Sequence, residues 1–139
     1  MVGKEWLVDA SGCDAALLRE RSRVVTVCDR IIRDLDLHVI GDPVIHSFPD
    51  GGGLTAFYLL TESHLACHTY PESGIATFNL YCCHERPEWN WGEELASAFA
   101  AKDTNVTVVA RGTGVSGTAA VGTAVAGTPP SAETVLGDR

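Results

Sequence analysis

The chain has 139 residues, a length that suits one domain rather than two. Ten Lys and Arg residues against 18 Asp and Glu residues give a formal net charge of −8, which argues against non-specific binding of nucleic acid or of an anionic membrane. Hydrophobic residues make up 45% of the sequence, too many for a disordered chain. The composition therefore indicates a small, acidic, folded domain.

The two ends of the sequence differ from its middle. The first nine residues, MVGKEWLVD, contain no long apolar stretch and no small-residue cleavage site, so no signal peptide is expected and the predicted location is cytoplasmic. In that compartment the five cysteines are expected to be thiols. Residues 112–131 carry no charge, no Leu, no Ile and no aromatic residue, too little apolar surface to cross a membrane. We expect a folded body of residues 1–112 and a flexible, low-complexity tail of residues 113–139.

The first part of the body combines a strand with a helix. Residues 4–9 alternate between apolar and polar side chains, which is typical of a strand. Apolar residues then recur at spacings of three, four and seven from Leu17 to Leu35, which predicts an amphipathic helix. Asp14 stands where its N-cap is expected.

Short strands dominate the rest of the body. Four apolar or alternating runs are separated by breaks too short for parallel crossovers, so they are expected to be antiparallel neighbours. These runs are residues 44–48, 54–61, 64–70 and 75–83. Asn90, with Glu93 three positions later, predicts the start of a second helix, and residues 104–110 predict a last strand. This order predicts an α+β fold in which helices cover one face of an antiparallel sheet.

Reactive side chains gather between positions 46 and 84, where four of the five histidines and three of the five cysteines lie. One interpretation is a metal site. Neither Cys67-His68 nor Cys82-Cys83-His84 has the spacing that brings two ligands to one ion, and neighbouring strand residues point to opposite faces. We therefore predict that the chain has no metal site.

The other interpretation is a reactive centre around Glu62-Ser63-His64, although a serine between two strands is often only a turn residue. Strand alternation places His64 and His68 on one face. A histidine at position 68 is either a satisfied interior residue or a group with an adjusted pKa beside the turn. The spacing leaves both possibilities open.

Residues 53–83 read GLTAFYLLTESHLACHTYPESGIATFNLYCC. This run resembles the core of the short prokaryotic S-adenosylmethionine decarboxylases, self-processing pyruvoyl enzymes of spermidine and polyamine synthesis. The residues that carry the resemblance are Glu62-Ser63-His64, His68-Thr69, Pro71-Glu72 and Cys83. The resemblance extends from residue 4 to about residue 112.

The resemblance implies a reaction of the chain with itself. The Ser63 hydroxyl would attack the carbonyl of Glu62, and elimination of the resulting ester would leave a pyruvoyl group at position 63. The products would be a β chain of residues 1–62 and an α chain of residues 63–139. By the same resemblance, His68 is the base for the Ser63 Cα proton, and Thr55 is the hydroxyl residue that assists processing.

The resemblance also implies how substrate is handled. The pyruvoyl ketone would condense with the amine of S-adenosylmethionine as a Schiff base and accept the electrons released with carbon dioxide. Cys83 matches the family's proton donor and Glu72 its ribose-binding carboxylate. Tyr70 stands for an aromatic residue near the adenine, with Phe48 on the other side. The implied assembly is a homodimer of two-layer α/β sandwiches with active sites near the interface.

Two other functions stay open from the sequence. The cleavage motif specifies the cofactor rather than the substrate, so a pyruvoyl-dependent decarboxylase of ornithine or arginine is one alternative. The other is an unprocessed, non-enzymatic homologue that acts as a partner subunit or a ligand-binding module.

Overall fold

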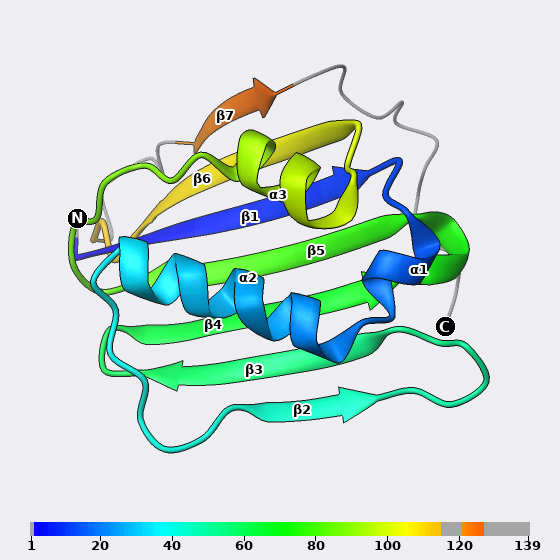
Figure 1. The fold of residues 1–139 in the computed structure, drawn as a ribbon. Helices are drawn as coiled ribbons and strands as arrows, with labels where there is room; N and C mark the ends of the chain where they lie inside the picture. The colour runs from blue at the N-terminus through cyan, green and yellow to red at the C-terminus, as the bar shows by residue number, and fades with distance from the viewer. Residues whose placement is uncertain (1, 115–120, 127–139) are drawn as a thin grey trace.

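The computed structural model describes residues 2–114 and 121–126, and it contains one antiparallel sheet with helices on one face (Figure 1). The spatial order of the strands is β2-β3-β4-β5-β1-β6-β7. The strands are β1 (Gly3–Ser11), β2 (Val44–Ser47), β3 (Leu54–Leu60), β4 (Ser63–Tyr70), β5 (Ile75–Cys82), β6 (Asp103–Arg111) and β7 (Val121–Ala126). The helices are α1 (Ala15–Leu18), α2 (Arg21–Asp34), α3 (Trp91–Phe99) and the 3₁₀ turn η1 (Pro71–Ser73).

The sequence predicts a single helix after Asp14, but the structure has two, α1 and α2, in this region. Asp14 Oδ1 does accept the N–H groups of Ala16 and Leu17, at 2.8 and 3.3 Å, and so caps α1. The helix then breaks, and Glu20 in an extended conformation becomes the N-cap of α2. Tertiary contact compensates for the break, because the buried Thr69 hydroxyl donates to the Leu18 carbonyl at 2.9 Å.

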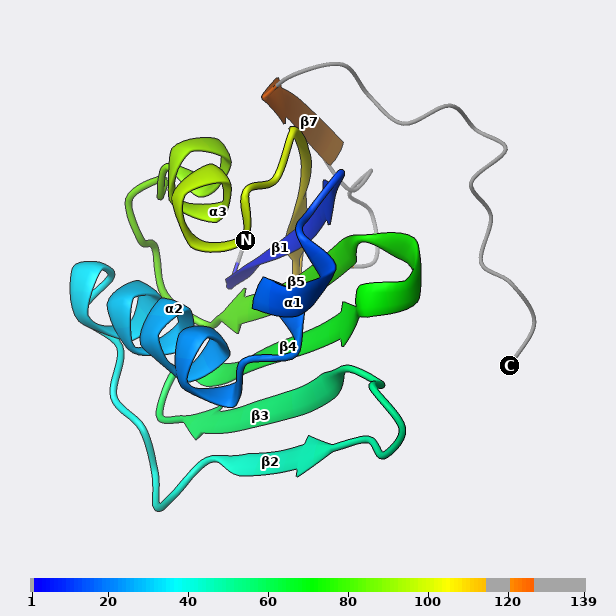
Figure 2. The same ribbon diagram turned by 45° about the vertical axis from the view of Figure 1, so that its right-hand side comes forward.

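The core lies between the sheet and the helices, and strand alternation sets its composition. On β4, Leu65, Cys67 and Thr69 share one face, as the alternation predicts, and the structure shows that this face is the buried one. On α2, the buried side chains recur at helical spacing: Val24, Val27, Cys28 and Ile31. Figure 2 shows α2 and α3 side by side on the same side of the sheet.

The opposite side of the sheet carries no helix among the described residues, and we call it the uncovered face (Figure 2). It holds the other alternate residues of the strands, including Leu7, Phe57 and Leu59, which are 41%, 41% and 49% exposed. His64 and His68 of β4 lie on this face as well. Apolar residues gathered on an open sheet face indicate that something packs there.

Strand β7 corrects the prediction for the end of the chain. Residues 121–126 pair with β6 and extend the sheet, although the composition predicts a flexible tail there. Main-chain hydrogen bonding to an edge strand needs no large side chains, so a Gly-, Ala- and Val-rich segment meets the requirement. Residues 115–120 and 127–139, the rest of that predicted tail apart from 113–114, lie outside the described residues.

Candidate functional site

The turn between β3 and β4 holds the predicted cleavage site. Leu60 pairs with Ser63, so Thr61 and Glu62 form the turn itself. Ser63 has a φ of 148°, in a region that residues other than glycine rarely occupy. Such a conformation costs on the order of 1–3 kcal/mol and persists only where the surroundings enforce it. Strain is therefore concentrated at the residue that the motif marks as the nucleophile.

The end of β5 lies against this turn. Ser63 is the register partner of Cys82, and the next N–H, that of Cys83, donates to the Glu62 carbonyl at 2.8 Å. This contact brings three predicted site residues together: Glu62, Ser63 and Cys83. The carbonyl that Ser63 would attack is thereby already polarised by a hydrogen-bond donor.

The buried Glu62 side chain holds the turn in place. Its carboxylate is only 2% exposed, and it accepts hydrogen bonds from the His38 N–H, the His38 ring and the Thr61 hydroxyl, each at 2.9 Å. Arg86 Nη2 lies 3.9 Å away. Burial by itself raises the pKa of this carboxyl, but the hydrogen bonds from His38 and Thr61 outweigh it and leave the pKa below its ordinary value. Glu62 is therefore an ionised anchor.

A second group of predicted residues surrounds His68. Its Nδ1 lies 2.6 Å from the Thr55 hydroxyl, across the β3–β4 ladder. The ring centroids of Tyr70 and Phe48 lie 4.4 and 5.7 Å from that of His68. Burial lowers the pKa of His68, and the charge of Glu72 opposes this only in part. A neutral imidazole is the form that accepts a proton.

The two groups lie at opposite ends of β4. Five residue steps separate Ser63 from His68, which amounts to about 16 Å at the rise of a strand. Within one chain, His68 therefore does not reach the Ser63 Cα, whose proton the resemblance assigns to it. Glu62, Ser63 and Cys83 form one half of the predicted site, and Phe48, Thr55, His68, Tyr70 and Glu72 the other.

Among the five free thiols, Cys83 is the exposed one. Burial raises the pKa of Cys13 and Cys82 to about 11 and that of Cys28 to about 12, and it also raises that of Cys67. These four thiols are therefore held protonated, as expected of structural cysteines.

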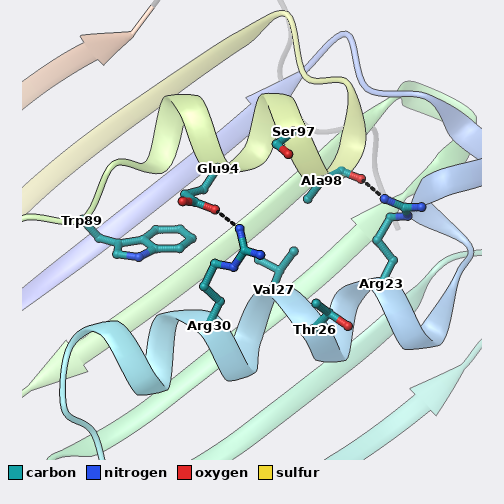
Figure 3. A pocket seen from close by; sticks show the side chains of 8 residues that line it. All are labelled: Arg23, Thr26, Val27, Arg30, Trp89, Glu94, Ser97 and Ala98. Carbon is teal, nitrogen blue, oxygen red and sulfur yellow. Dashed lines mark hydrogen bonds and ion pairs between the residues drawn. The ribbon is translucent and has the colours of Figure 1, made fainter.

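Two hollows lie among the described residues, and only one of them is lined by a predicted site residue. A cavity of about 130 Å³ lies between α2 and α3, where Arg30 pairs with Glu94 and Arg23 donates to the Ala98 carbonyl (Figure 3). None of the predicted site residues lines it. A second hollow, of about 260 Å³, includes one predicted site residue, Cys83, and is lined by Val2, Gly3, Lys4, Cys83, His84 and Glu85.

The site contains residues that the sequence did not single out. His38 lies 24 residues before Glu62 and Arg86 lies 24 residues after it, so only tertiary folding brings them to Glu62. Asn79 contacts His64 across the β4–β5 hairpin, at a distance of 2.9 Å between side-chain atoms. Diagonal neighbours of this kind follow from the hairpin register, so a predicted register for residues 64–83 would have paired them.

The part of the chain that the structure describes has no helix long and apolar enough to cross a membrane. Nor do the described residues bring three or more His, Cys, Asp or Glu side chains together as a metal-binding group.

Comparison with known proteins shows which family the chain is similar to. The sequence model of the family described as S-adenosylmethionine decarboxylase matches residues 4–112. The S-adenosylmethionine decarboxylase proenzyme of Pyrobaculum aerophilum is 33% identical over 90 residues, 63% of this chain and 70% of the relative. That of Acetivibrio thermocellus is 31% identical over 112 residues, 80% of this chain and 89% of the relative.

A solved structure matches as well. The crystal structure of the adenosylmethionine decarboxylase from Aquifex aeolicus superposes with a TM-score of 0.69 at 24% identity, covering 84% of this chain and 96% of that one. This likeness confirms the α+β fold predicted from the sequence. Because the family match spans most of the chain, the chain belongs to the S-adenosylmethionine decarboxylase family.

Proposed function

We propose that the chain is a proenzyme that cleaves itself between Glu62 and Ser63 and then decarboxylates S-adenosylmethionine, a step of spermidine synthesis. One observation carries the proposal: the strained Ser63 follows a carbonyl that already accepts the Cys83 N–H at 2.8 Å. The membership of the chain in its family supports the same reaction. The names of its relatives do not favour ornithine or arginine as the substrate.

The first step of self-cleavage exchanges a peptide bond for an ester. Ser63 Oγ attacks the Glu62 carbonyl carbon, and the Cys83 N–H stabilises the negative charge that develops on the carbonyl oxygen. Collapse breaks the C–N bond. Relief of the strained φ at Ser63 favours this step, and the ionised, buried Glu62 side chain keeps the turn in place while the bond is exchanged.

The second step removes the Ser63 Cα proton and expels the main-chain carboxylate of Glu62, which becomes the C-terminus of the β chain. Hydration of the dehydroalanine and loss of ammonia then leave a pyruvoyl group at the start of the α chain. The residues around position 63 fit such a group, because the exposed Cys83 is hydrogen-bonded to the neighbouring Glu62 carbonyl and lines the 260 Å³ hollow. The group supplies an electron sink for the loss of carbon dioxide. Cys83 then delivers a proton to the former carboxylate carbon.

The other half of the site suits the substrate. Tyr70 and Phe48 offer aromatic faces, to which a sulfonium cation and an adenine ring are both attracted. Glu72 supplies a carboxylate for the ribose hydroxyls. His68, hydrogen-bonded to Thr55 and held neutral by burial, is the proposed base for the Ser63 Cα proton.

These roles require the two halves to meet, and a homodimer meets that requirement. The uncovered face carries His68 near one end of β4 and exposed apolar side chains such as Leu59 and Phe57. Two copies that pack through this face about a two-fold axis would place the His68 end of one protomer against the Ser63 end of its partner. The proposed active site is therefore shared between protomers. The cytoplasmic location stays a prediction from the sequence.

Denaturing electrophoresis and mass spectrometry of the purified chain test the proposal. We expect two fragments that divide at Glu62 and Ser63, and a single intact chain for the variant Ser63→Ala. A wild-type chain that stays intact on long incubation would refute self-processing. Release of carbon dioxide from arginine or ornithine, with none from S-adenosylmethionine, would refute the proposed substrate.

A further inference from the structure

A chain of hydrogen bonds starts at Ser63 and crosses the neighbouring strands β4, β5, β1 and β6. Ser63 Oγ lies 3.1 Å from His64 Nδ1, and His64 Nε2 lies 2.9 Å from Asn79 Oδ1. Asn79 Nδ2 donates to Glu5 Oε1 at 2.8 Å, and Glu5 in turn pairs with Arg111. Each link uses a different atom, so the chain is continuous from the nucleophile to a cation.

The chemistry of the donors and acceptors sets the direction of this chain. Burial by itself raises the pKa of Glu5, but the hydrogen bonds from Asn79 and Arg111 outweigh it and leave the pKa below its ordinary value. An ionised carboxylate only accepts, so Asn79 turns its NH₂ group toward Glu5 and its oxygen toward His64. The oxygen also only accepts, so the proton of His64 lies on Nε2.

This tautomer leaves a lone pair on His64 Nδ1, directed at the Ser63 hydroxyl. Neighbouring residues of a strand ordinarily point to opposite faces, and the unusual φ of Ser63 interrupts that alternation. The conformation that strains the backbone is thus the one in which the hydroxyl meets the adjacent ring. The contact is specific to this turn.

Aromatic side chains hold the ring in this orientation. Phe57 stacks on His64 with centroids 5.8 Å apart and an interplanar angle of 19°, and Tyr81 meets it edge-on at 6.0 Å. With both nitrogens hydrogen-bonded and two rings against it, the imidazole has little freedom. A base whose orientation is set before the reaction loses little entropy in reaching the transition state.

From this geometry we propose that His64 is the general base that activates Ser63, an assignment that rests on the proposed self-cleavage and gives its first step a catalytic residue. As the Ser63 Oγ bond to the Glu62 carbonyl carbon forms, the hydroxyl proton moves to His64 Nδ1. When the C–N bond then breaks, the imidazolium returns that proton to the departing nitrogen of Ser63. The amide has become an ester of the same composition, and His64 is restored.

Asn79 and Glu5 are positioning residues in this mechanism. They hold the proton on His64 Nε2 and do not touch the reacting atoms. The two histidines of β4 then act in separate steps. His64 removes the hydroxyl proton to form the ester, and His68 of the partner removes the Cα proton to eliminate it.

Hydroxylamine distinguishes the two steps, because it cleaves an ester at position 62/63 and leaves the amide intact. We expect His64→Ala and His64→Gln to slow self-cleavage by about 100-fold or more, with a chain that stays resistant to hydroxylamine. The matched control is His68→Ala, which we expect to be intact but sensitive to hydroxylamine. Added imidazole should restore cleavage of His64→Ala, since it fits the space between Phe57 and Tyr81.

Three results would overturn the assignment: cleavage of the His64 variants at the wild-type rate, accumulation of a hydroxylamine-sensitive ester in them, or no effect of imidazole. Far-UV circular dichroism identifies a variant that has not folded, and the glutamine variant serves if the alanine variant fails. A wild-type chain that does not cleave would instead refute the proposed function, so the two failures are distinguishable.

Asn79 provides a test of positioning. Asn79→Leu removes the acceptor for His64 Nε2, whereas Asn79→Asp keeps one. We therefore expect cleavage at least tenfold slower in the leucine variant than in the aspartate variant, a difference of about 1.4 kcal/mol in activation free energy. Equal rates in the two variants would show that the hydrogen bond to Asn79 has no part in the reaction.

Discussion

Mixed dimers of two inactive variants test whether the site is shared between protomers. In one chain, Ser63 and His68 stand about 16 Å apart along β4, too far for one to abstract a proton from the other. If each site combines Ser63 of one protomer with His68 of its partner, a dimer of Ser63→Ala and a dimer of His68→Ala are each unable to cleave, because each lacks a different half of the site. Together they complement each other, because a heterodimer contains one site with both residues intact.

The structure also determines the size of the effect. Random association of equal amounts makes about half of all dimers heterodimers, and each of these has one intact site of two. The mixture should therefore process about a quarter of its sites, all in the chains that carry His68→Ala. Co-expression of the two chains with different tags, followed by mass spectrometry of the fragments, measures this directly.

Processing of neither chain in the mixture would refute a site shared in this way. Processing of the His68→Ala chain alone, without its partner, would show that His68 has no part in the reaction. A matched mixture of His68→Ala with Thr55→Ala is the control. Thr55 and His68 lie in the same half of the site, so every site in a heterodimer still contains one of the two substitutions, and processing should not exceed that of the two variants alone.

Three further predictions concern stability and assembly. In the Ser63→Ala background, the free energy of unfolding should be steady above about pH 4.5 and fall at lower pH, because the lowered pKa of Glu62 in the folded state makes its protonation destabilising. Urea titrations at several pH values should show a smaller fall for Glu62→Gln. An equal dependence of the free energy on pH in the two proteins would contradict this. Gly53→Ala should destabilise the fold by about 2–3 kcal/mol, because its Cβ would lie 2.0 Å from the Thr69 carbonyl oxygen; an unchanged Tm would refute the clash. Leu59→Glu, on the uncovered face, should convert dimers to monomers in sedimentation velocity, and a dimer of unchanged stability would place the interface elsewhere.

Local patterns in the sequence predicted most of the secondary structure. Alternation within residues 64–70 separates the buried Leu65 from the uncovered-face His68, as the structure confirms. Asn90 caps α3, where its side-chain oxygen accepts the Glu93 N–H at 3.4 Å. These features depend on the period of side chains along one element and on hydrogen bonds within one turn, which neighbouring residues decide by themselves.

Long-range contacts decided what the patterns could not. The break between α1 and α2 is stabilised by a hydrogen bond from Thr69, which is 51 residues from Leu18. Strand β7 forms because it pairs with the edge strand β6. The cleavage motif identified Ser63 and His68 as partners in one reaction, but the length of β4 separates them within a chain. Chemistry follows from residue types that a sequence displays directly, whereas the distance between two side chains depends on how every intervening strand packs.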